Sequence, residues 1–326
     1  MRPALKPGLA TVWRNRDTVQ IGIDPRRAIA LTGMRGAAGL LRLLDGSRDR
    51  RQVLAAAGDL GMDAATADRV LTLLAVAGAL DDLPAGGYGA VPAGARARLA
   101  PELATASLAH GDADGGARTL ARRQAACVRV HGASRAGLSI AGMLTAAGIG
   151  LLVATGVAGP AAAGPAAAGP VRTGTGPGPR SRPRRRPDLV ILADTPRREL
   201  PAALVRRAVP HLAAAASEAI GVVGPLVLPG RSACLRCLDL TRAEHDPAWP
   251  LILAQLAGLT AADPPACDTV LATMVAAQAA AQALAFVGQG AAAAVTNGTL
   301  ELVLPGWQWR RRTWQPHPRC DCRHPG

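Results

Sequence analysis

The sequence predicts an α/β protein in which a small winged-helix-like α+β domain precedes a doubly wound parallel sheet. Two short strand patterns followed by three helical patterns occupy residues 1–86. Strand and helix patterns then alternate through residues 126–326, as they do in parallel sheets whose strands are joined by helices. The 326 residues also give room for two domains of roughly 150 residues each.

Composition and charge limit the chemistry open to this chain. Hydrophobic residues make up 49% of it but aromatic residues only 2%, so Ala, Leu, Val and Ile must build the core. The net charge of +14 comes almost wholly from Arg, because Lys6 is the one lysine. A phosphate loop that contains Lys is therefore excluded, as is an internal Schiff-base lysine. Selection for phosphate contact gives no reason to exclude Lys, so we attribute the Arg excess to coding bias and do not expect nucleic-acid binding.

The first residues, MRPALKPGLATVWRNRD, lack an apolar stretch of signal-peptide length, and we expect a cytoplasmic protein. Residues 136–171, between Arg135 and Arg172, carry no charge, and their first part is about long enough to span a bilayer. Ala and Gly dominate this stretch, and Gly148 and Gly150 would break a helix. We expect a buried helix followed by a buried strand here, and a membrane span is the alternative.

The N-terminal domain is built from short elements. Val19–Asp24 and Ala28–Gly33 have the pattern of short strands, and a helical pattern follows them and ends at Gly46. Ser47 and Asp63 have the short polar side chains that cap helices. We therefore expect each of them to begin one of the two helices that follow.

Two segments interrupt this order of elements. Residues 87–125 are rich in Gly and Ala and are predicted to be a linker with a helix near Arg118–Arg123. Residues 158–187 combine a five-residue Gly-Pro repeat with the run RSRPRRRP, a composition unsuited to a helix or a sheet interior. We expect a disordered low-complexity loop there.

The segment VRVHGASRAGLSIAGMLTAAGIG predicts a strand, a tight turn and a helix. Gly132, Ser134 and Gly137 occupy the three glycine positions of a dinucleotide-binding turn. The first glycine permits the turn and the third lets the helix approach the strand, but the middle one should be bare so that backbone N–H groups reach phosphate. Ser134 is expected to project into that space. The next strand, Leu151–Thr155, is followed by Gly156 instead of the acidic residue that binds ribose.

A further strand pattern, DLVILAD, ends at Asp194. In open α/β sheets, ligands and metal ions bind at the carboxyl ends of the strands, so Asp194 is a candidate site residue. A carboxylate in this position also serves as a turn or helix-capping residue. The sequence leaves both interpretations open.

The cysteines give the strongest chemical signal. Two short pairs, Cys234 with Cys237 and Cys320 with Cys322, have spacings that allow four thiolates to surround one structural zinc ion. His317 and His324 flank the second pair and could replace one of its sulfurs. A redox role for the first pair would need a thioredoxin-like context, which the sequence lacks. The two remaining cysteines are expected to be packing residues: Cys127 and Cys267.

Residues 126–326 resemble the ThiF/MoeB family of ubiquitin-activating-like adenylyltransferases. The resemblance rests on GPLVLPGRSACLRCLD, on CDTVLATMVAAQAAAQALAFVG and on NGTLELVL followed by RTW and HPRCDC. It implies a Rossmann-like ThiF-type sheet, ATP-dependent adenylation of a peptide or small-protein carboxylate, and a structural zinc ion. The four paired cysteines match the zinc ligands, Gly132 and Gly137 match the glycine turn, and Asp194 matches the Asp near metal and triphosphate.

The chain also departs from this family. Gly156 replaces the ribose-binding Asp, the Gly-Pro repeat stands where Asn and Arg contact the triphosphate, and the ATP-contacting Lys is missing. Each lost charge-assisted contact should cost ~1.5–3 kcal/mol of binding free energy. We therefore expect a degenerate, pseudoenzyme-like nucleotide site at Gly132, Ser134, Gly137 and Asp194, which has lost useful ATP binding.

Residues 1–86 resemble PqqD-type recognition domains, which bind the leader peptides of ribosomally made peptides. The matching stretches are VQIGID, LLRLLDGSRDRRQVL and VLTLLAVAGALDD. The resemblance implies that a leader peptide adds as a strand beside Val19–Asp24, Ala28–Thr32 and the helix near Arg69–Leu74. Together, the two domains resemble the leader-binding partners of azole- and azoline-forming cyclodehydratases, in which a YcaO-type subunit performs the ATP chemistry.

We therefore expect a scaffold that binds a precursor peptide, works with a YcaO-type or similar enzyme and forms a homodimer. One alternative is an active adenylyltransferase in which Arg135 binds phosphate and Asp194 binds the metal. A second alternative is a DNA-binding regulator that uses Arg48, Arg50 and Arg51.

Overall fold

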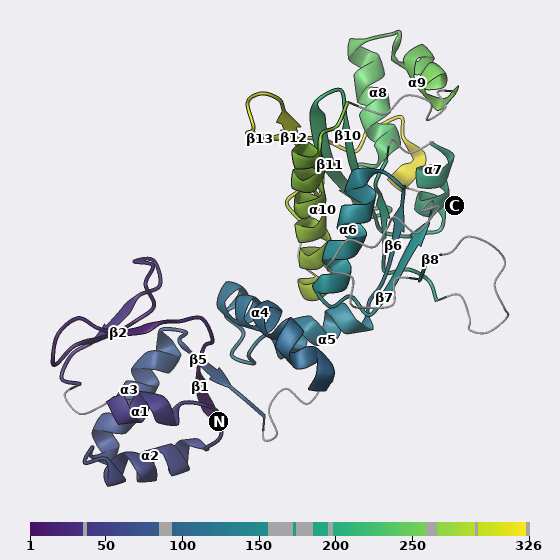
Figure 1. The fold of residues 1–326 in the computed structure, drawn as a ribbon. Helices are drawn as coiled ribbons and strands as arrows, with labels where there is room; N and C mark the ends of the chain where they lie inside the picture. The colour runs from purple at the N-terminus through teal and green to yellow at the C-terminus, as the bar shows by residue number, and fades with distance from the viewer. Residues whose placement is uncertain are drawn as a thin grey trace. The chain divides into compact units, whose positions relative to one another are not determined.

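The computed structural model describes residues 1–34, 38–84, 93–155, 172–173, 185–194, 198–258, 266–290 and 293–323. The chain forms two compact units, Met1–Ala121 (unit 1) and Arg122–Gly326 (unit 2), which are described separately (Figure 1).

Two small sheets form the β part of unit 1. Strand β1 (Pro3–Leu5) pairs antiparallel with β5 (Leu80–Asp82). The second sheet has the order β2 (Thr11–Trp13), β3 (Val19–Ile21) and β4 (Ile29–Leu31), all antiparallel. β3 and β4 confirm the cores of the two predicted strands, whereas β2 was not predicted. All three residues of β2 are exposed, so the strand has no alternating apolar pattern that would reveal it.

Three helices cover these sheets: α1 (Ala38–Leu43), α2 (Arg50–Asp59) and α3 (Ala64–Val76). The Asp63 carboxylate accepts a hydrogen bond from the Thr66 N–H and caps α3, as predicted. The prediction that Ser47 caps α2 is wrong, because Asp49 makes the reciprocal capping box with Gln52. The core contains Val19, Ile21, Leu40, Leu71 and Leu74.

The predicted linker 87–125 needs correction, because within it the structure places α4 (Ala93–His110) and α5 (Ala117–Ala125). Helix α5 covers the helix predicted near Arg118–Arg123, but α4 was missed, since Pro101 interrupts its sequence and its apolar face is weak. Helix α4 belongs to unit 1.

A buried ion pair attaches α4 to the β1–β5 sheet. Lys6 Nζ lies 2.9 Å from a carboxylate oxygen of Asp81 and donates to Ser107 Oγ at 2.9 Å and to the Ser107 carbonyl at 2.8 Å. The Ser107 hydroxyl in turn donates to Asp81. All three residues are buried. The one lysine of the chain therefore holds together strands and a helix that lie about a hundred residues apart in sequence.

Unit 2 is built on an eight-stranded sheet with the order β13-β12-β11-β10-β9-β6-β7-β8. The strands from β8 to β10 in this order run parallel, and β10 to β13 run antiparallel to their neighbours. The strands are β6 (Cys127–His131), β7 (Leu151–Thr155), β8 (Arg172–Thr173), β9 (Leu189–Leu192), β10 (His211–Ser217), β11 (Ile220–Val227), β12 (Gly298–Val303) and β13 (Trp309–Thr313).

Helices cover both faces of this sheet, as the doubly wound pattern predicts (Figure 1). Leu189 and Ile191 of β9 face a core shared with α6 (Arg135–Ala146) and α10 (Thr269–Gln289). The alternate residues Val190 and Leu192 face α7 (Glu199–Arg206) and α8 (Leu235–His245) on the other side. Helix α9 (Trp249–Gly258) follows α8.

The uncharged stretch that begins at residue 136 forms the expected helix and strand. Helix α6 ends at Ala146, Gly148 has a φ of +89°, and β7 starts at Leu151. The alternative of a membrane span is wrong for this part, since no continuous helix runs through it. Residues 156–171 and most of the predicted loop 158–187 lie outside the described residues; Arg172–Thr173, described within that loop, form β8.

Helix α10 is the one helix among the described residues that is long and apolar enough to cross a membrane. Its buried residues, among them Leu271, Val275 and Ala279, lie in the core of unit 2 beside α6 and the sheet. A core helix meets the same criteria of length and composition, and the packing of α10 is that of a core helix.

We predict that the buried ion pair of unit 1 becomes destabilising when one partner is removed. Lys6→Ala leaves the Asp81 carboxylate buried without its cation and should lower the free energy of unfolding by about 3–5 kcal/mol. The double variant Lys6→Met/Asp81→Leu removes both charges and should recover most of this loss. Urea unfolding followed by circular dichroism measures both. Equal stabilities of Lys6→Ala and the wild type would contradict this account.

We also predict a pH-dependent stability that originates in unit 2. Burial lowers the pKa of His211 to about 4, and its Nδ1 lies 3.0 Å from the Val209 carbonyl as a hydrogen-bond donor. The unfolded chain binds a proton here near pH 6.5, so the free energy of unfolding falls as the pH drops from about 6.5 to about 4, by ~3 kcal/mol in total. His211→Gln should remove this component from denaturant titrations at pH 7.5, 5.5 and 4.5.

The exposed His245 provides the control, because His245→Gln leaves the buried ring in place. A slope of stability against pH that is the same in the wild type and in His211→Gln would show that the buried imidazole does not cause it.

Candidate functional site

The strand order brings the predicted nucleotide-site residues together. After β6 the chain crosses through α6 to β7 on one side, while β9 pairs with β6 on the other side. The carboxyl ends of β6 and β9 therefore meet at the topological switch point, where open α/β sheets bind ligands. Gly132 follows β6 at this point and Asp194 follows β9.

The turn after β6 requires glycine for two separate reasons. Gly132 has a φ of +125°, and a Cβ atom there would lie 2.6 Å from Asp194 Oδ2. At Gly137 a Cβ atom would lie 2.7 Å from the Gly132 carbonyl oxygen and 3.1 Å from Ala193 Cβ. The two glycines thus allow β6, α6 and β9 to approach one another closely. The space left by the missing side chains at Gly132 and Gly137 is therefore filled by other atoms of the protein, such as the Asp194 carboxylate.

Two N–H groups of this turn donate hydrogen bonds to side chains of the chain itself. Asp194 Oδ2 accepts a hydrogen bond from the Ala133 N–H at 3.1 Å. Ser134 Oγ accepts one from the Gly137 N–H at 3.2 Å, which caps α6, and donates to the Ala193 carbonyl at 2.8 Å. Ser134 therefore serves as the capping residue of α6, and its hydroxyl is held between the start of α6 and the end of β9.

Other residues near the turn are also engaged. The exposed Arg135 donates from Nη1 to Thr269 Oγ1, at the start of α10, over 3.3 Å. His131 Nδ1 lies 2.7 Å from Thr155 Oγ1, a hydrogen bond between the ends of β6 and β7 that the sequence analysis missed. Burial and the charge of Arg129 lower the pKa of His131. The one signal in the sequence for His131 and Thr155 as site residues is that each is the last residue of a predicted strand. Gly156, expected to replace the ribose-binding Asp, lies outside the described residues.

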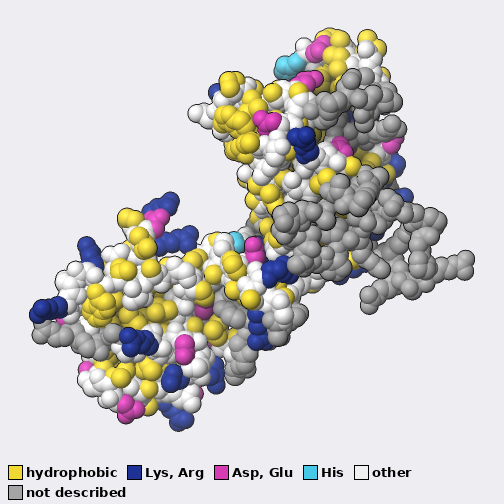
Figure 2. Space-filling view, in the orientation of Figure 1, with side chains coloured by type: hydrophobic (Ala, Val, Ile, Leu, Met, Phe, Trp, Pro, Cys, Tyr) yellow, Lys and Arg dark blue, Asp and Glu magenta, His cyan; other side chains and the backbone are white. Residues whose placement is uncertain are grey.

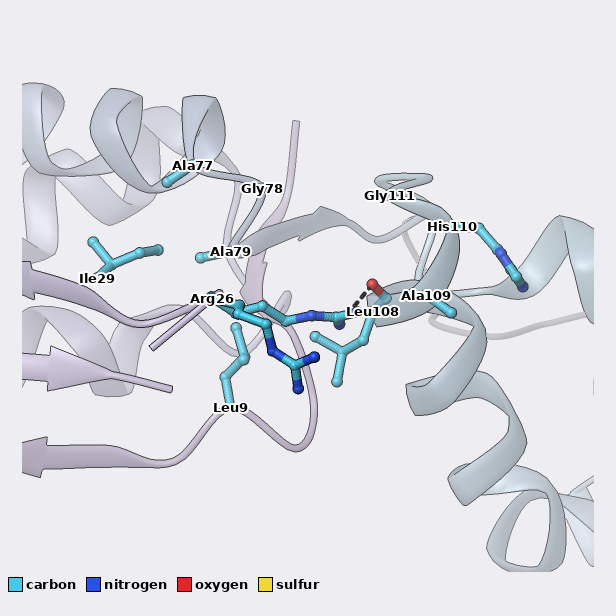
Figure 3. A pocket seen from close by; sticks show the side chains of 11 residues that line it. Leu9, Arg26, Ile29, Ala77, Gly78, Ala79, Leu108, Ala109, His110 and Gly111 are labelled. Atoms are coloured by element: carbon cyan, nitrogen blue, oxygen red, sulfur yellow. Dashed lines mark hydrogen bonds between the residues drawn. The ribbon is translucent and has the colours of Figure 1, made fainter. Parts of the chain in front are cut away.

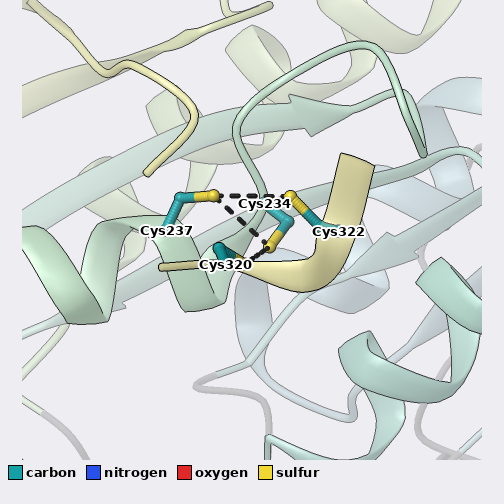
Figure 4. Close-up of side chains that lie close together, drawn as sticks. All are labelled: Cys234, Cys237, Cys320 and Cys322. Atoms are coloured by element: carbon teal, nitrogen blue, oxygen red, sulfur yellow. Dashed lines mark hydrogen bonds between the residues drawn. The ribbon is translucent and has the colours of Figure 1, made fainter. Parts of the chain in front are cut away.

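Four buried cysteines form a second site (Figure 4). Cys234 is the N-cap residue of α8 and Cys237 lies in its first turn, while Cys320 and Cys322 lie at the short 3₁₀ helix η2 (Asp321–Arg323). The Sγ atom of Cys234 lies 3.8 Å from the Sγ atom of Cys237 and 3.6 Å from that of Cys320. The Sγ atoms of Cys237 and Cys322 are 3.5 Å apart. All four sulfurs lie within 4.8 Å of one another.

This arrangement is compatible with a tetrahedral metal ion. Zinc–sulfur bonds of about 2.3 Å place the sulfurs of a regular tetrahedron about 3.8 Å apart, close to the observed separations. The first turn of α8 also supplies a positive helix end, which favours thiolates. A hydrogen bond from the Cys234 thiol lowers the pKa of Cys237 to about 4, and burial raises the pKa of Cys322 to about 12. These residues would hold zinc as a structural ion.

The suggestion that His317 could replace a sulfur is wrong, because hydrogen bonds occupy both of its ring nitrogens. Its Nε2 lies 2.9 Å from a carboxylate oxygen of Glu244, and its Nδ1 accepts from the Arg319 N–H at 3.1 Å. His317 therefore fixes the segment that carries the second cysteine pair. His324 lies outside the described residues.

The Arg residues named for DNA binding are partly engaged within unit 1. Arg50 forms an ion pair of 2.6 Å with Asp68 and donates to Thr72 Oγ1, whereas Arg48 lies 3.9 Å from Asp45 and Arg51 is exposed. On the face seen in Figure 2, the Lys and Arg side chains are scattered among other types. This face shows no continuous basic patch among the described residues.

We predict that the purified protein holds one zinc ion per chain and that Cys320→Ser loses it. Removal of one of four ligands should also destabilise the attachment of η2 to α8, since structural zinc binding contributes ~10–16 kcal/mol in small peptides. Elemental analysis measures the metal. Cys267→Ser is the matched control, since Cys267 packs beside the core of unit 2 and lies outside the cluster. Zinc-free wild-type protein, or full occupancy in Cys320→Ser, would refute the assignment.

No family model matches the chain, and no curated protein matches its sequence. Among solved structures, the chain is similar to MccB of E. coli with AMPCPP and MccA, with a TM-score of 0.67 and 13% identity over 99% of both chains. The microcin C7 biosynthetic enzyme MccB in complex with N-formylated MccA gives a TM-score of 0.65 and 14% identity over 99% of this chain and 100% of that one.

The chain is also similar to the heterocyclase TruD, with a TM-score of 0.64 and 16% identity over 98% of this chain and 42% of TruD. At these identities the likeness concerns the fold. It confirms the ThiF-type α/β fold expected from the sequence, and it covers both units of the chain.

Proposed function

We propose that the chain is a peptide-binding scaffold in the modification of a ribosomally made peptide and does not use ATP itself. Unit 1 binds the leader segment of the precursor peptide in a PqqD-like manner, and unit 2 presents the peptide to a separate enzyme, such as a YcaO-type cyclodehydratase subunit. The chain acts as a homodimer in the cytoplasm. The observation that carries the proposal is the occupation of the glycine turn by Asp194 and Ser134.

An anion at this turn would meet unfavourable electrostatics. The Asp194 carboxylate already accepts from the Ala133 N–H, so a phosphate must displace it or lie beside its negative charge. The Gly137 N–H, a second donor near the start of α6, is taken by Ser134. With Lys6 buried in unit 1, the chain has no lysine to offset these losses. We infer that the site has lost useful ATP affinity.

The peptide role is supported by the free edge of a small sheet in unit 1. Among the described residues, β4 pairs with β3 alone, so its other edge is open to an added strand. In the same unit, α3 exposes Leu73 and Val76, which are 56% and 84% accessible. Backbone hydrogen bonds to β4 would give affinity, and apolar side chains of the peptide would bury these two residues.

The similar structures favour peptide modification over other uses of the fold. MccB is described as a microcin C7 biosynthetic enzyme and has been solved with MccA, and TruD is a heterocyclase. The complex that contains AMPCPP shows that MccB accommodates an ATP analogue. In this chain, the hydrogen bonds that Asp194 and Ser134 accept at the turn support a scaffold over an active enzyme.

We predict that calorimetric titration with ATP and Mg²⁺ gives no binding in the micromolar range and that pyrophosphate exchange is absent with or without peptide. Micromolar binding would refute the scaffold. Exchange that disappears in Arg135→Ala would instead establish the active adenylyltransferase. Asp194→Asn serves as a further variant, because a gain of ATP affinity there would identify the carboxylate as the group that excludes the nucleotide.

Peptide binding is tested with synthetic peptides that correspond to short reading frames beside the gene. We predict that one of them binds the full-length chain and that Ala30→Pro, a substitution on the open edge strand β4, weakens this binding at least tenfold. Binding that is unchanged in Ala30→Pro would exclude the edge of β4 as the site.

A further inference from the structure

Unit 1 has a cavity at one end of the open edge of β4 (Figure 3). Its volume of about 440 Å³ falls in the range of roughly 300–1,000 Å³ that binding sites for small groups occupy. Ile29, the first residue of β4, and Ala77 at the end of α3 lie on one side, and Leu108 and Ala109 of α4 lie on the other. The cavity therefore lies where a strand added to β4 would end.

The titratable residues in the cavity wall are basic. Arg26, Arg27 and His110 line it, and among the described residues no acidic side chain does. Each guanidinium carries five N–H donors in a fork that fits a carboxylate. Arg27 uses Nη1 for the Leu108 carbonyl at 2.9 Å, which holds its side chain between the strand and α4. Because this hydrogen bond fixes the guanidinium, its remaining N–H groups can donate to a ligand.

Arg26 is oriented by a neighbour outside the wall. Its Nε and Nη2 lie 2.9 and 2.6 Å from the two oxygens of Asp24, in a paired arrangement on the surface. Asp24 offsets one positive charge, so the wall keeps about one net positive charge from its two arginines. Leu9, Ile29 and Leu108 contribute apolar side chains to the lining.

We infer that this cavity receives an acidic side chain, Asp or Glu, of the peptide that adds to β4. The inference rests on the proposed function, since it assigns the charge of that ligand. A strand beside β4 would lie about 4.8 Å away, with its side chains alternating between the two faces. The residue opposite Ile29 and on the same face reaches toward the cavity.

The faces of β4 also predict the character of a second peptide residue, two positions from the acidic one. Leu31 shares a face of β4 with Ile29 and is buried in the core of unit 1, so the peptide residue two positions from the acidic one is apolar. The ligand is thus an extended segment with an acidic and an apolar residue at a spacing of two. The open strand edge beside the cavity favours a peptide over a nucleic-acid phosphate.

The test is a selection of random twelve-residue peptides, displayed on phage, on the immobilised full-length chain. Enriched sequences are expected to share Asp or Glu two positions from an apolar residue. In a synthetic copy of an enriched peptide, Glu→Gln should weaken binding roughly fivefold, as expected for a partly exposed charge pair. Selection on Arg26→Glu should enrich Lys or Arg at that position, because the side chain of Arg26 is 87% exposed and its charge can be reversed without loss of packing.

Arg51→Glu is the matched control, with the same change of charge at an exposed position on α2 outside the cavity lining. It should keep the acidic preference of the wild type. Arg27→Gln, which retains a donor for Leu108, should weaken the preference without changing its sign.

The outcomes separate this inference from the proposed function. Suppose that peptides are enriched and that Ala30→Pro no longer binds them. If they show no preference for Asp or Glu, or if selection on Arg26→Glu gives the same acidic preference as the wild type, the cavity assignment is overturned and the proposed scaffold function stands. A selection without any enriched peptide would overturn both. Binding of a duplex oligonucleotide that Arg26→Glu abolishes would assign the basic wall to phosphate and refute the peptide ligand.

Discussion

The close approach of β6, α6 and β9 around two glycines is the constraint on which the functional interpretation depends. Since neither Gly132 nor Gly137 has a side chain, Asp194 reaches the backbone of the turn and Ala193 contacts the helix. The fold thus keeps the geometry that nucleotide-binding sheets use, but the N–H groups of Ala133 and Gly137 donate to side chains of the chain itself. A phosphate site needs donors directed at an empty space, and here the space beside the Ala133 N–H holds a carboxylate.

Two kinds of contact hold the segment after β13, which contains Trp314 and η2, against α8. At the start of α8, the cysteine cluster joins the helix to η2. Further along α8, the guanidinium carbon of Arg242 lies 4.9 Å from the ring centre of Trp249 and 5.4 Å from that of Trp314. Cation–π contacts of this kind stabilise most where water is excluded, and Trp314 is buried. In a chain with few aromatic residues, these side chains and the cysteines attach the last residues to the core.

Unit 1 combines a firm core with surfaces left open for a ligand. Its helices pack on buried Val19, Ile21 and Leu71, and a buried ion pair holds α4 to the β1–β5 sheet. Such a pair loses much solvation on burial, so its net contribution to stability is small, whereas the loss of one partner alone is costly. The C-terminal end of α4 in turn forms one wall of the cavity beside β4. The helix that Lys6 contacts through Ser107 thus also supplies residues of the cavity wall.

The sequence by itself determined the elements that depend on near neighbours in the chain. Apolar runs defined β6, β7 and β9, Asp63 marked the start of α3, and the spacing within each cysteine pair indicated thiolate ligands. Short exposed strands such as β2 and the weakly amphipathic α4 gave no local pattern and were missed.

Only the tertiary structure decided which distant residues meet. Local patterns do not encode strand order, and it is the pairing of β6 with β9 that brings Asp194 to the Ala133 N–H. The same applies to Lys6 and Asp81, and to the four sulfurs, whose two pairs are separated by more than eighty residues. The energy of each contact depends on burial and distance, and the packing of the whole chain sets both.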